Sequence, residues 1–131
     1  MEFKITLNVN KESGDLLPFN YQYEQSAVIY RILAHADTQY ASWLHENGYQ
    51  LNGHKRVKLF CYSPFIFDKV RPLPESGCLK IMDERAVWHI SFIPEKSTLE
   101  FIQGIFAHQS FIVGNKEHRV AFGVAGVEAM P

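Results

Sequence analysis

The chain contains few cysteines and no long apolar run. Cys61 and Cys78 are its two cysteines, too few for a disulfide framework, and we interpret both as reduced packing residues. No segment approaches the roughly 20 consecutive apolar residues that cross a bilayer. The N-terminus enters an alternating pattern instead of the apolar core of a signal peptide. These absences predict a cytoplasmic protein with no membrane partner.

Motifs that hold metals or phosphates are also missing. No two of the six histidines have the spacing of familiar zinc motifs, and the two cysteines stand seventeen residues apart. Gly123 and Gly126 flank the last expected strand without forming a phosphate-cradling loop. We therefore expect no metal, no cofactor and no nucleotide hydrolysis.

Charge of neither sign is in excess. A net charge of −1 argues against indiscriminate binding to nucleic acid, which usually shows as a strongly basic chain. Between positions 55 and 71, however, basic residues are interleaved with aromatic ones. This composition suits single-stranded RNA, because cations meet phosphates and rings stack on bases; the alternative is a solvated loop with a buried aromatic strand. The residues concerned are Lys55, Arg56, Lys58, Phe60, Tyr62, Phe65, Phe67, Lys69 and Arg71, opposed only by Asp68.

Alternation of apolar and polar residues predicts the strands. In the first of them Phe3, Ile5 and Leu7 alternate with polar neighbours, so one face should be buried and the other wet. A strand that begins at Val57 would place Lys58, Phe60 and Tyr62 on one face. Further strands are expected over 78–82, as a hairpin partner of the next strand, and over 87–92, 111–113 and 120–124, the last two joined by a hairpin turn at 114–115.

Two main helices and one short helix are expected. Apolar positions between Val28 and Ala36 form the stripe of the first helix. Asp37 can cap the short helix, which Asn47-Gly48 would end, and Ser97 with Glu100 forms a capping-box pattern ahead of the last helix. Residues 1–131 are therefore expected to form a single α+β domain, a ferredoxin-like βαββαβ sandwich with a short extra helix after the first helix and hairpin insertions. Two helices would cover one face of a four-stranded antiparallel sheet and leave the other face open.

Tyr30, His45 and Lys58 are the candidate catalytic residues. Tyr30 lies about 130° from the centre of its helical stripe, so the helix would present its hydroxyl away from the core. His45 falls in the last turn of the short helix, where the helix dipole favours the imidazolium; the alternative is an ordinary surface histidine. Metal-free RNA cleavage needs one group to remove a proton, one to protonate the leaving oxygen and a cation for the phosphorane. Each role has one candidate here.

Five segments and their order carry a resemblance to a known family. The segments are Leu17–Tyr23, Ala27–Tyr30, Trp43–Glu46, Lys58–Ser63 and Phe111–Asn115. With the closing strand they resemble the CRISPR-associated repeat-processing endoribonucleases, the Cas-six family, which cut a repeat transcript into guide RNAs. The resemblance implies metal-independent attack by a ribose 2′-hydroxyl that leaves a 2′,3′-cyclic phosphate and a 5′-hydroxyl. It implies His45 as general acid, Tyr30 as base or orienter of the 2′-hydroxyl, and Lys58 as the group that stabilises the phosphorane.

The resemblance also sets the expected partners and the alternatives. CRISPR repeat RNA is the expected substrate, and other CRISPR effector subunits are candidate partners. The family usually carries a second domain of similar fold with a glycine-rich loop, and these 131 residues are expected to correspond to the N-terminal half alone. A non-catalytic RNA-binding or subunit-docking fragment is therefore one alternative, and a ferredoxin-like homodimer that senses a metabolite is another. The expected RNA-binding residues are Lys55, Arg56, Phe60, Tyr62, Lys69 and Arg71.

Overall fold

The computed structural model describes residues 1–51, 55–57 and 60–131, with residues 49–51 and 55–57 described by their backbone alone. Within these ranges, no helix combines the length and the apolar character needed to cross a membrane. The elements in chain order are β1 (Glu2–Asn10), the 3-10 helix η1 (Lys11–Ser13), β2 (Leu16–Pro18), α1 (Gln22–Ala36), α2 (Thr38–Glu46), β3 (Tyr49–Leu51), β4 (Lys55–Val57), β5 (Phe60–Tyr62), β6 (Val70–Leu73), β7 (Cys78–Ile81), β8 (Arg85–Phe92), α3 (Glu95–Ala107), β9 (Ser110–Gly114) and β10 (Arg119–Met130).

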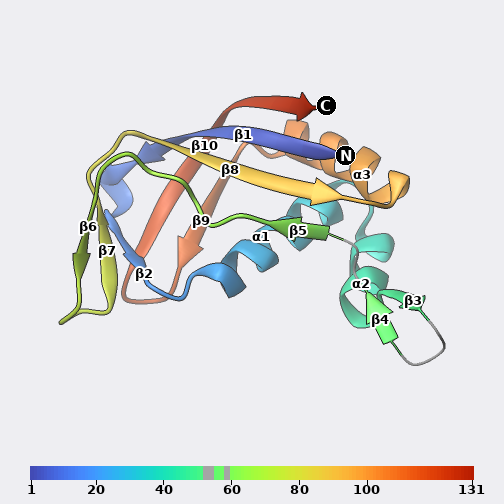
Figure 1. Ribbon diagram of the computed structural model, residues 1–131, viewed down its shortest axis with the longest axis horizontal. Helices are drawn as coiled ribbons and strands as arrows, with labels where there is room; N and C mark the ends of the chain where they lie inside the picture. The colour runs from blue at the N-terminus through green and yellow to red at the C-terminus, as the bar shows by residue number, and fades with distance from the viewer. Residues whose placement is uncertain (52–54, 58–59) are drawn as a thin grey trace.

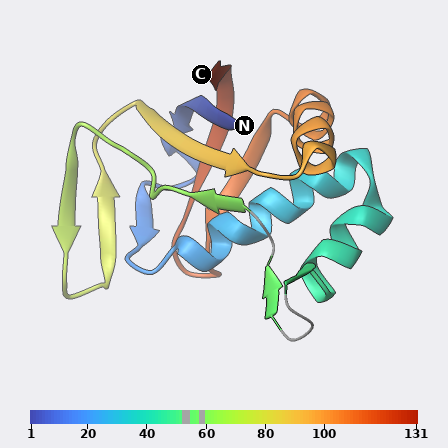
Figure 2. The ribbon, with the colours of Figure 1, turned by 45° about the vertical axis from the view of Figure 1, so that its right-hand side comes forward.

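The main sheet is antiparallel, and its described strands follow the order β5-β8-β1-β10-β9. β1 lies at its centre, with Phe3, Ile5 and Leu7 buried on one face. The helices α1 and α3 lie together on that face (Figures 1 and 2). The strands β5, β8, β1 and β10 with these two helices form the ferredoxin-like arrangement, so the predicted α+β fold is confirmed.

The sheet differs from the prediction in its number of strands. The described part has five strands where four were expected, because the hairpin at Gly114-Asn115 adds β9 at the edge, paired with β10. The strand expected from Val57 includes residues 58 and 59, which lie outside the described residues. β4 ends at Val57 and pairs with β3, whereas β5 begins at Phe60 and joins the main sheet beside β8.

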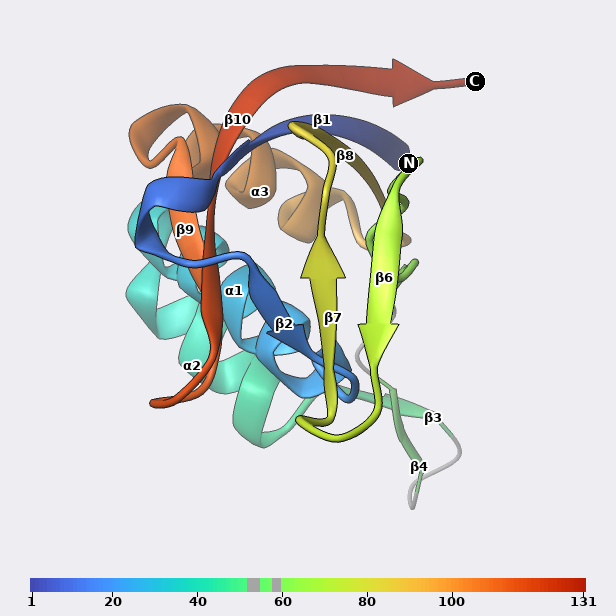
Figure 3. The same cartoon turned by 90° about the vertical axis from the view of Figure 1, so that its left-hand side faces the viewer.

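A second sheet of the described residues has the order β2-β7-β6 and lies at one end of the molecule (Figure 3). The prediction that residues 78–82 form a hairpin with the following strand is wrong, because β7 pairs with β6 and β2 instead of β8. Pro72 lies inside β6, an edge strand, where a residue without an N–H can be accommodated.

Gly104 sets how closely α3 approaches α1. A Cβ atom at this position would lie 1.8 Å from the carbonyl oxygen of Ile32 on α1, well inside van der Waals contact. The two helices can therefore pack backbone to backbone only because this residue has no side chain. Their contact covers the buried face of the sheet and fixes the position of α1.

α3 begins earlier than its capping-box pattern predicted. The helix starts at Glu95, with Pro94 at the N-cap position, so Ser97 lies within its first turn and is fully buried. The Ser97 hydroxyl hydrogen-bonds the hydroxyl of Tyr40 on α2 instead of capping its own helix. The capping-box prediction is therefore wrong, because a tertiary hydrogen bond uses the side chain that the local pattern assigned to the backbone.

Asp37 ends α1 and begins α2. Its backbone N–H donates to the carbonyl of Leu33, and its Oδ1 accepts a hydrogen bond of 2.9 Å from the backbone N–H of Tyr40. The predicted cap of the short helix is confirmed, as is its end, where Gly48 has a φ of 66°. One residue thus joins the helix that carries Tyr30 to the helix that carries His45.

Candidate functional site

α1 and α2 bring Tyr30 and His45 into contact. Their rings meet edge to face, with 4.8 Å between centroids and an interplanar angle of 84°. His45 lies in the last turn of α2 and is exposed, whereas Tyr30 is half-buried in the second half of α1. Fifteen residues separate the two in sequence, and the turn at Asp37 folds α2 back along α1 so that they meet.

Phe60 completes an aromatic cluster around Tyr30. The Phe60 ring, at the start of β5, lies 5.5 Å from the Tyr30 ring at 81°. The hydroxyl oxygen of Tyr30 is buried. The helical wheel predicted that this hydroxyl is presented away from the core and is free for chemistry. The expectation of a free hydroxyl is wrong, because His45 of α2 and Phe60 of β5 pack against this side of α1.

A hollow of about 250 Å³ lies beside this pair, between α1 and α2. Apart from Tyr30 and His45, its polar lining consists of Arg31, Ser42 and Glu46. Sequence reasoning did not find these three residues. The one available signal was adjacency, since Arg31 follows Tyr30 directly and Glu46 follows His45.

Lys58 lies outside the described residues, so its predicted role at the phosphorane stays a prediction. Lys55 and Arg56 belong to β4, where the backbone alone is described. β4 lies at the same end of the molecule as α2 (Figure 1). Their RNA-binding role likewise stays a prediction.

Lys69 and Arg71 are exposed, in the segment that leads into β6 and in β6 itself. Figure 1 shows β6 at the end of the molecule opposite to α2. The structure therefore does not bring Lys69 and Arg71 together with Tyr30 and His45. A role of theirs in RNA binding would involve a separate part of the surface.

Phe60 and Tyr62 share one face of β5, as predicted, and this face looks toward the helices. The hydroxyl of Tyr62 donates a hydrogen bond of 2.8 Å to the carbonyl of Gln22, and its ring meets Trp88 edge to face. Phe65 is buried and stacks on Tyr21. Much of the aromatic surface in this basic segment thus packs against the protein, as the alternative interpretation of the segment expected.

A polar network holds α2 against α3. Lys96 on α3 contacts Asp37 at 3.3 Å and Glu100 at 3.2 Å, and its Nζ lies 4.9 Å from the centroid of the Tyr40 ring. The N–H of Tyr40 and then Lys96 lower the pKa of the Asp37 carboxyl, while Glu100 and Asp37 raise the pKa of Lys96. With the bond between Tyr40 and Ser97, these contacts fix the N-terminal half of the helix that carries His45.

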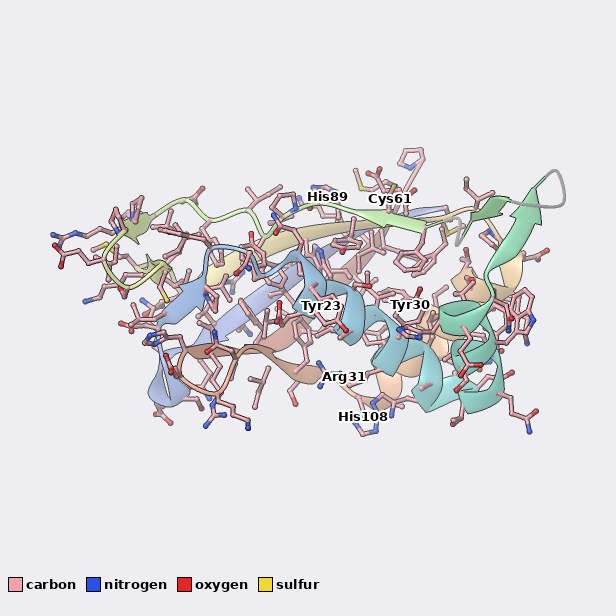
Figure 4. The ribbon with its side chains drawn as sticks, turned by 90° about the horizontal axis from the view of Figure 1, so that it is seen from below. Tyr23, Tyr30, Arg31, Cys61, His89 and His108 are labelled. Atoms are coloured by element: carbon pink, nitrogen blue, oxygen red, sulfur yellow. The ribbon has the colours of Figure 1, made fainter. Side chains whose placement is uncertain are left out.

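Cys61 and His89 lie on the other side of the molecule, on the open face of the main sheet (Figure 4). His89 approaches Glu2 at 3.6 Å. In the described part of the chain, no three His, Cys, Asp or Glu side chains gather closely enough to hold a metal ion. Two of the three predicted catalytic residues, Tyr30 and His45, are in contact in the structure.

The domain is of the ferredoxin-like class, with an antiparallel sheet covered by α1 and α3. In addition, α2 folds back along α1 and completes a hollow beside Tyr30. The family model described as "CRISPR-associated protein Cas6, N-terminal" matches residues 16–123. The chain belongs to this family. The match runs from β2 to the first part of β10, so it includes α1, α2 and the whole candidate site.

Three solved structures share this fold. One is described as "An RAMP protein binding different RNA substrates" (TM-score 0.75, 22% identity), and one as "Characterization of a Cas6-related gene from Pyrococcus furiosus" (TM-score 0.76, 22% identity). A third, "CRISPR associated protein Cas6", has a TM-score of 0.67 and 23% identity. Each alignment covers 100% of this chain and 48% of the other, so the chain spans about half the length of these proteins. No curated protein sequence matches the chain.

Proposed function

We propose that this chain carries the cleavage site of a metal-independent endoribonuclease that processes CRISPR repeat RNA. The observation that carries the proposal is the contact between Tyr30 and His45, 4.8 Å between ring centroids, beside an open hollow. Membership in the Cas6 family supports the RNA substrate over the sensing of a metabolite.

In the proposed reaction the ribose 2′-oxygen attacks the adjacent phosphorus, and the bond from phosphorus to the 5′-oxygen breaks. Tyr30 accepts or orients the proton of the 2′-hydroxyl, and His45 donates a proton to the departing 5′-oxygen. The products are a 2′,3′-cyclic phosphate and a 5′-hydroxyl. Lys58 is the proposed cation for the charge that develops on the phosphorane.

His45 is the member of the pair that meets substrate first. Its side chain is exposed at the end of α2, whereas the Tyr30 hydroxyl oxygen is buried. Direct participation of Tyr30 therefore requires the side chains around its hydroxyl to shift when RNA binds. Its ring, in contrast, already supports the imidazole from one side, which suits a role in holding His45 in place.

The buried hydroxyl also favours a second candidate function, an RNA-binding domain that does not cut. A hydroxyl that stays covered cannot exchange a proton with a 2′-hydroxyl. In that case the contact between Tyr30 and His45 would be structural, and the domain would present RNA to another part of a CRISPR complex.

We also infer that residues 1–131 act as the first of two similar domains, with a second domain completing the RNA-binding groove. The description of the matching family model as N-terminal and the 48% coverage of the solved chains support this proposal. The second domain would supply cationic groups that a chain of net charge −1 has in short supply.

Cleavage of labelled repeat RNA in excess chelator tests the proposal. Wild-type protein, with residues 1–131 joined to the proposed second domain, should cut the RNA and leave a 2′,3′-cyclic phosphate, identified by mass spectrometry. His45→Ala and Lys58→Ala should not cut it. Binding without cutting in the wild type would support the RNA-binding candidate. Cleavage that stops in chelator and returns with added Mg²⁺ would contradict the metal-independent mechanism.

A further inference from the structure

Arg31 lies where two hollows of the surface meet. It follows Tyr30 on α1, is exposed, and lines the hollow that contains Tyr30 and His45. It also lines a second hollow, of about 560 Å³, with residues of β9 and of the neighbouring ends of β1 and β10. One guanidinium therefore borders both the candidate cleavage site and the next cavity along α1.

In the part of the chain that the structure describes, Arg31 forms no ion pair with an acidic side chain. The ion pairs among the described residues join His89 to Glu2 and Lys96 to Asp37 and Glu100, and none of them includes Arg31. Glu46 is the acidic residue that lines the first hollow, and the lining of the second includes none.

Two histidines lie beyond Arg31, at the ends of α1 and α3. His35 follows Arg31 by one helical turn, and its ring stacks on that of His108 with 3.4 Å between centroids and 15° between planes. His35 lies in the last turn of α1, and His108 is the C-cap residue of α3. The helix dipole favours positive charge at both places. Figure 4 shows Arg31 and His108 on the same side of the molecule, away from Cys61 and His89.

These groups repel one another when each carries a proton. The pKa of His35 is lowered, first by burial and then by His108 and Arg31. An anion placed among the three would remove this repulsion. The anion that a cleavage site for RNA always has beside it is the next phosphate of the backbone, which a guanidinium can bind with two parallel hydrogen bonds.

We propose that Arg31, supported by His35 and His108, binds a backbone phosphate of single-stranded RNA adjacent to the linkage held between Tyr30 and His45. This inference rests on the proposed function, because it takes the Tyr30–His45 hollow as the place where the strand is cut. In this proposal the RNA leaves that hollow along α1 and runs toward β9. Arg31 makes contact with substrate but takes no part in proton transfer.

The test measures binding of fluorescein-labelled CRISPR-repeat RNA by anisotropy, in chelator and over a series of KCl concentrations. Arg31→Ala should weaken binding roughly 10- to 100-fold, as expected for loss of a charge-assisted hydrogen bond. It should also lower the slope of log affinity against log salt by about 0.7, the value for one phosphate contact on a single strand. Arg31→Lys should retain most of the slope, because it keeps the charge, and lose part of the affinity.

Arg85→Ala is the matched control, because Arg85 is an exposed arginine at the start of β8, beside a different hollow. It should leave both affinity and slope within twofold of the wild type. An unchanged slope in Arg31→Ala, or an equal loss in Arg85→Ala, would overturn the inference.

The same measurements separate this inference from the proposed function. If wild-type protein binds repeat RNA without cutting it and Arg31→Ala lowers the slope, the phosphate contact stands and the nuclease proposal fails. If wild-type protein cuts and Arg31→Ala binds with an unchanged slope, the nuclease proposal stands and the phosphate contact fails. If wild-type protein does not bind repeat RNA, both fail.

Discussion

The imidazole of His45 rests against the ring of Tyr30 at 84°, so a residue of α2 depends on a residue of α1 for its orientation. Because His45 is exposed at the end of its helix, the contact with this ring helps to hold the imidazole on the α1 side. Replacement of either residue therefore tests chemistry and orientation together, and the choice of substitution can separate the two.

His45→Ala is expected to lower the single-turnover cleavage rate by about 10²- to 10⁴-fold, the usual contribution of a general acid or base. Affinity for repeat RNA should change little. Tyr30→Phe keeps the ring against His45 and removes the hydroxyl, so a large loss of rate would show that the hydroxyl itself acts. His89→Ala, on the open face of the sheet, is the control and should cut at the wild-type rate. Equal loss of rate in His89→Ala and His45→Ala would contradict the assignment.

Gly104→Ala should destabilise the fold. The added Cβ would lie 1.8 Å from the carbonyl oxygen of Ile32, so α1 and α3 must separate, and overpacking of this kind costs about 1–3 kcal/mol or more. Urea unfolding followed by circular dichroism measures the loss. Gly126→Ala is the matched control, because nothing lies within 4 Å of its added Cβ. A Gly104→Ala variant as stable as Gly126→Ala would show that the helices approach less closely than described.

Removal of the hydroxyl bond between α2 and α3 should weaken both the fold and the site. Tyr40→Phe is expected to cost about 1–3 kcal/mol of unfolding free energy, because it leaves the buried Ser97 hydroxyl without this partner. The double variant Tyr40→Phe/Ser97→Ala should lose less than the sum of the two single variants, which a double-mutant cycle measures. Tyr23→Phe, at a position 78% exposed, should be neutral. Strict additivity of Tyr40→Phe and Ser97→Ala would argue against the bond.

Acid should weaken the contact of α2 with α1 and α3. The pKa of Asp37 is lowered by the N–H of Tyr40 and by Lys96, so folding favours the ionised carboxylate. Its stabilisation is present above the ordinary pKa of 3.8 and is lost as the pH falls through the lowered value. Asp37→Asn should therefore show a smaller difference in urea stability between pH 7 and pH 3 than the wild type. Glu75→Gln, in the turn after β6, is the control. The same pH difference in Asp37→Asn and the wild type would exclude the linkage.

Local patterns predicted much of the fold because the forces that decide those features are local. The alternation of Phe3, Ile5 and Leu7 gave the central strand, and Asp37 gave the cap of α2, since each depends on residues within one turn or strand. β7 pairs with β2, sixty or more residues earlier in the sequence, and no local pattern carries that information. Its pairing with β6 is local, and the prediction missed it because it chose the strand after residues 78–82 instead of the strand before them. Ser97 was misassigned because its hydrogen-bond partner lies on another helix.

The sequence was enough to nominate individual residues of the candidate site, but not to predict how exposed they are or which residues surround them. Tyr30 and His45 stood out as residue types at helix positions, whereas the burial of the Tyr30 hydroxyl depends on Phe60 and on the angle between α1 and α2. Arg31 had no distinguishing pattern of its own. Its place between two hollows exists only once β9 is packed beside α1.

Asp37 is the last capping residue of α1 and the first of α2. It therefore fixes which face of α2 is turned toward α1. An insertion of one residue at this junction would turn every side chain of the following helix by about 100° about its axis. His45 would then leave the ring of Tyr30 although no residue of the pair had changed.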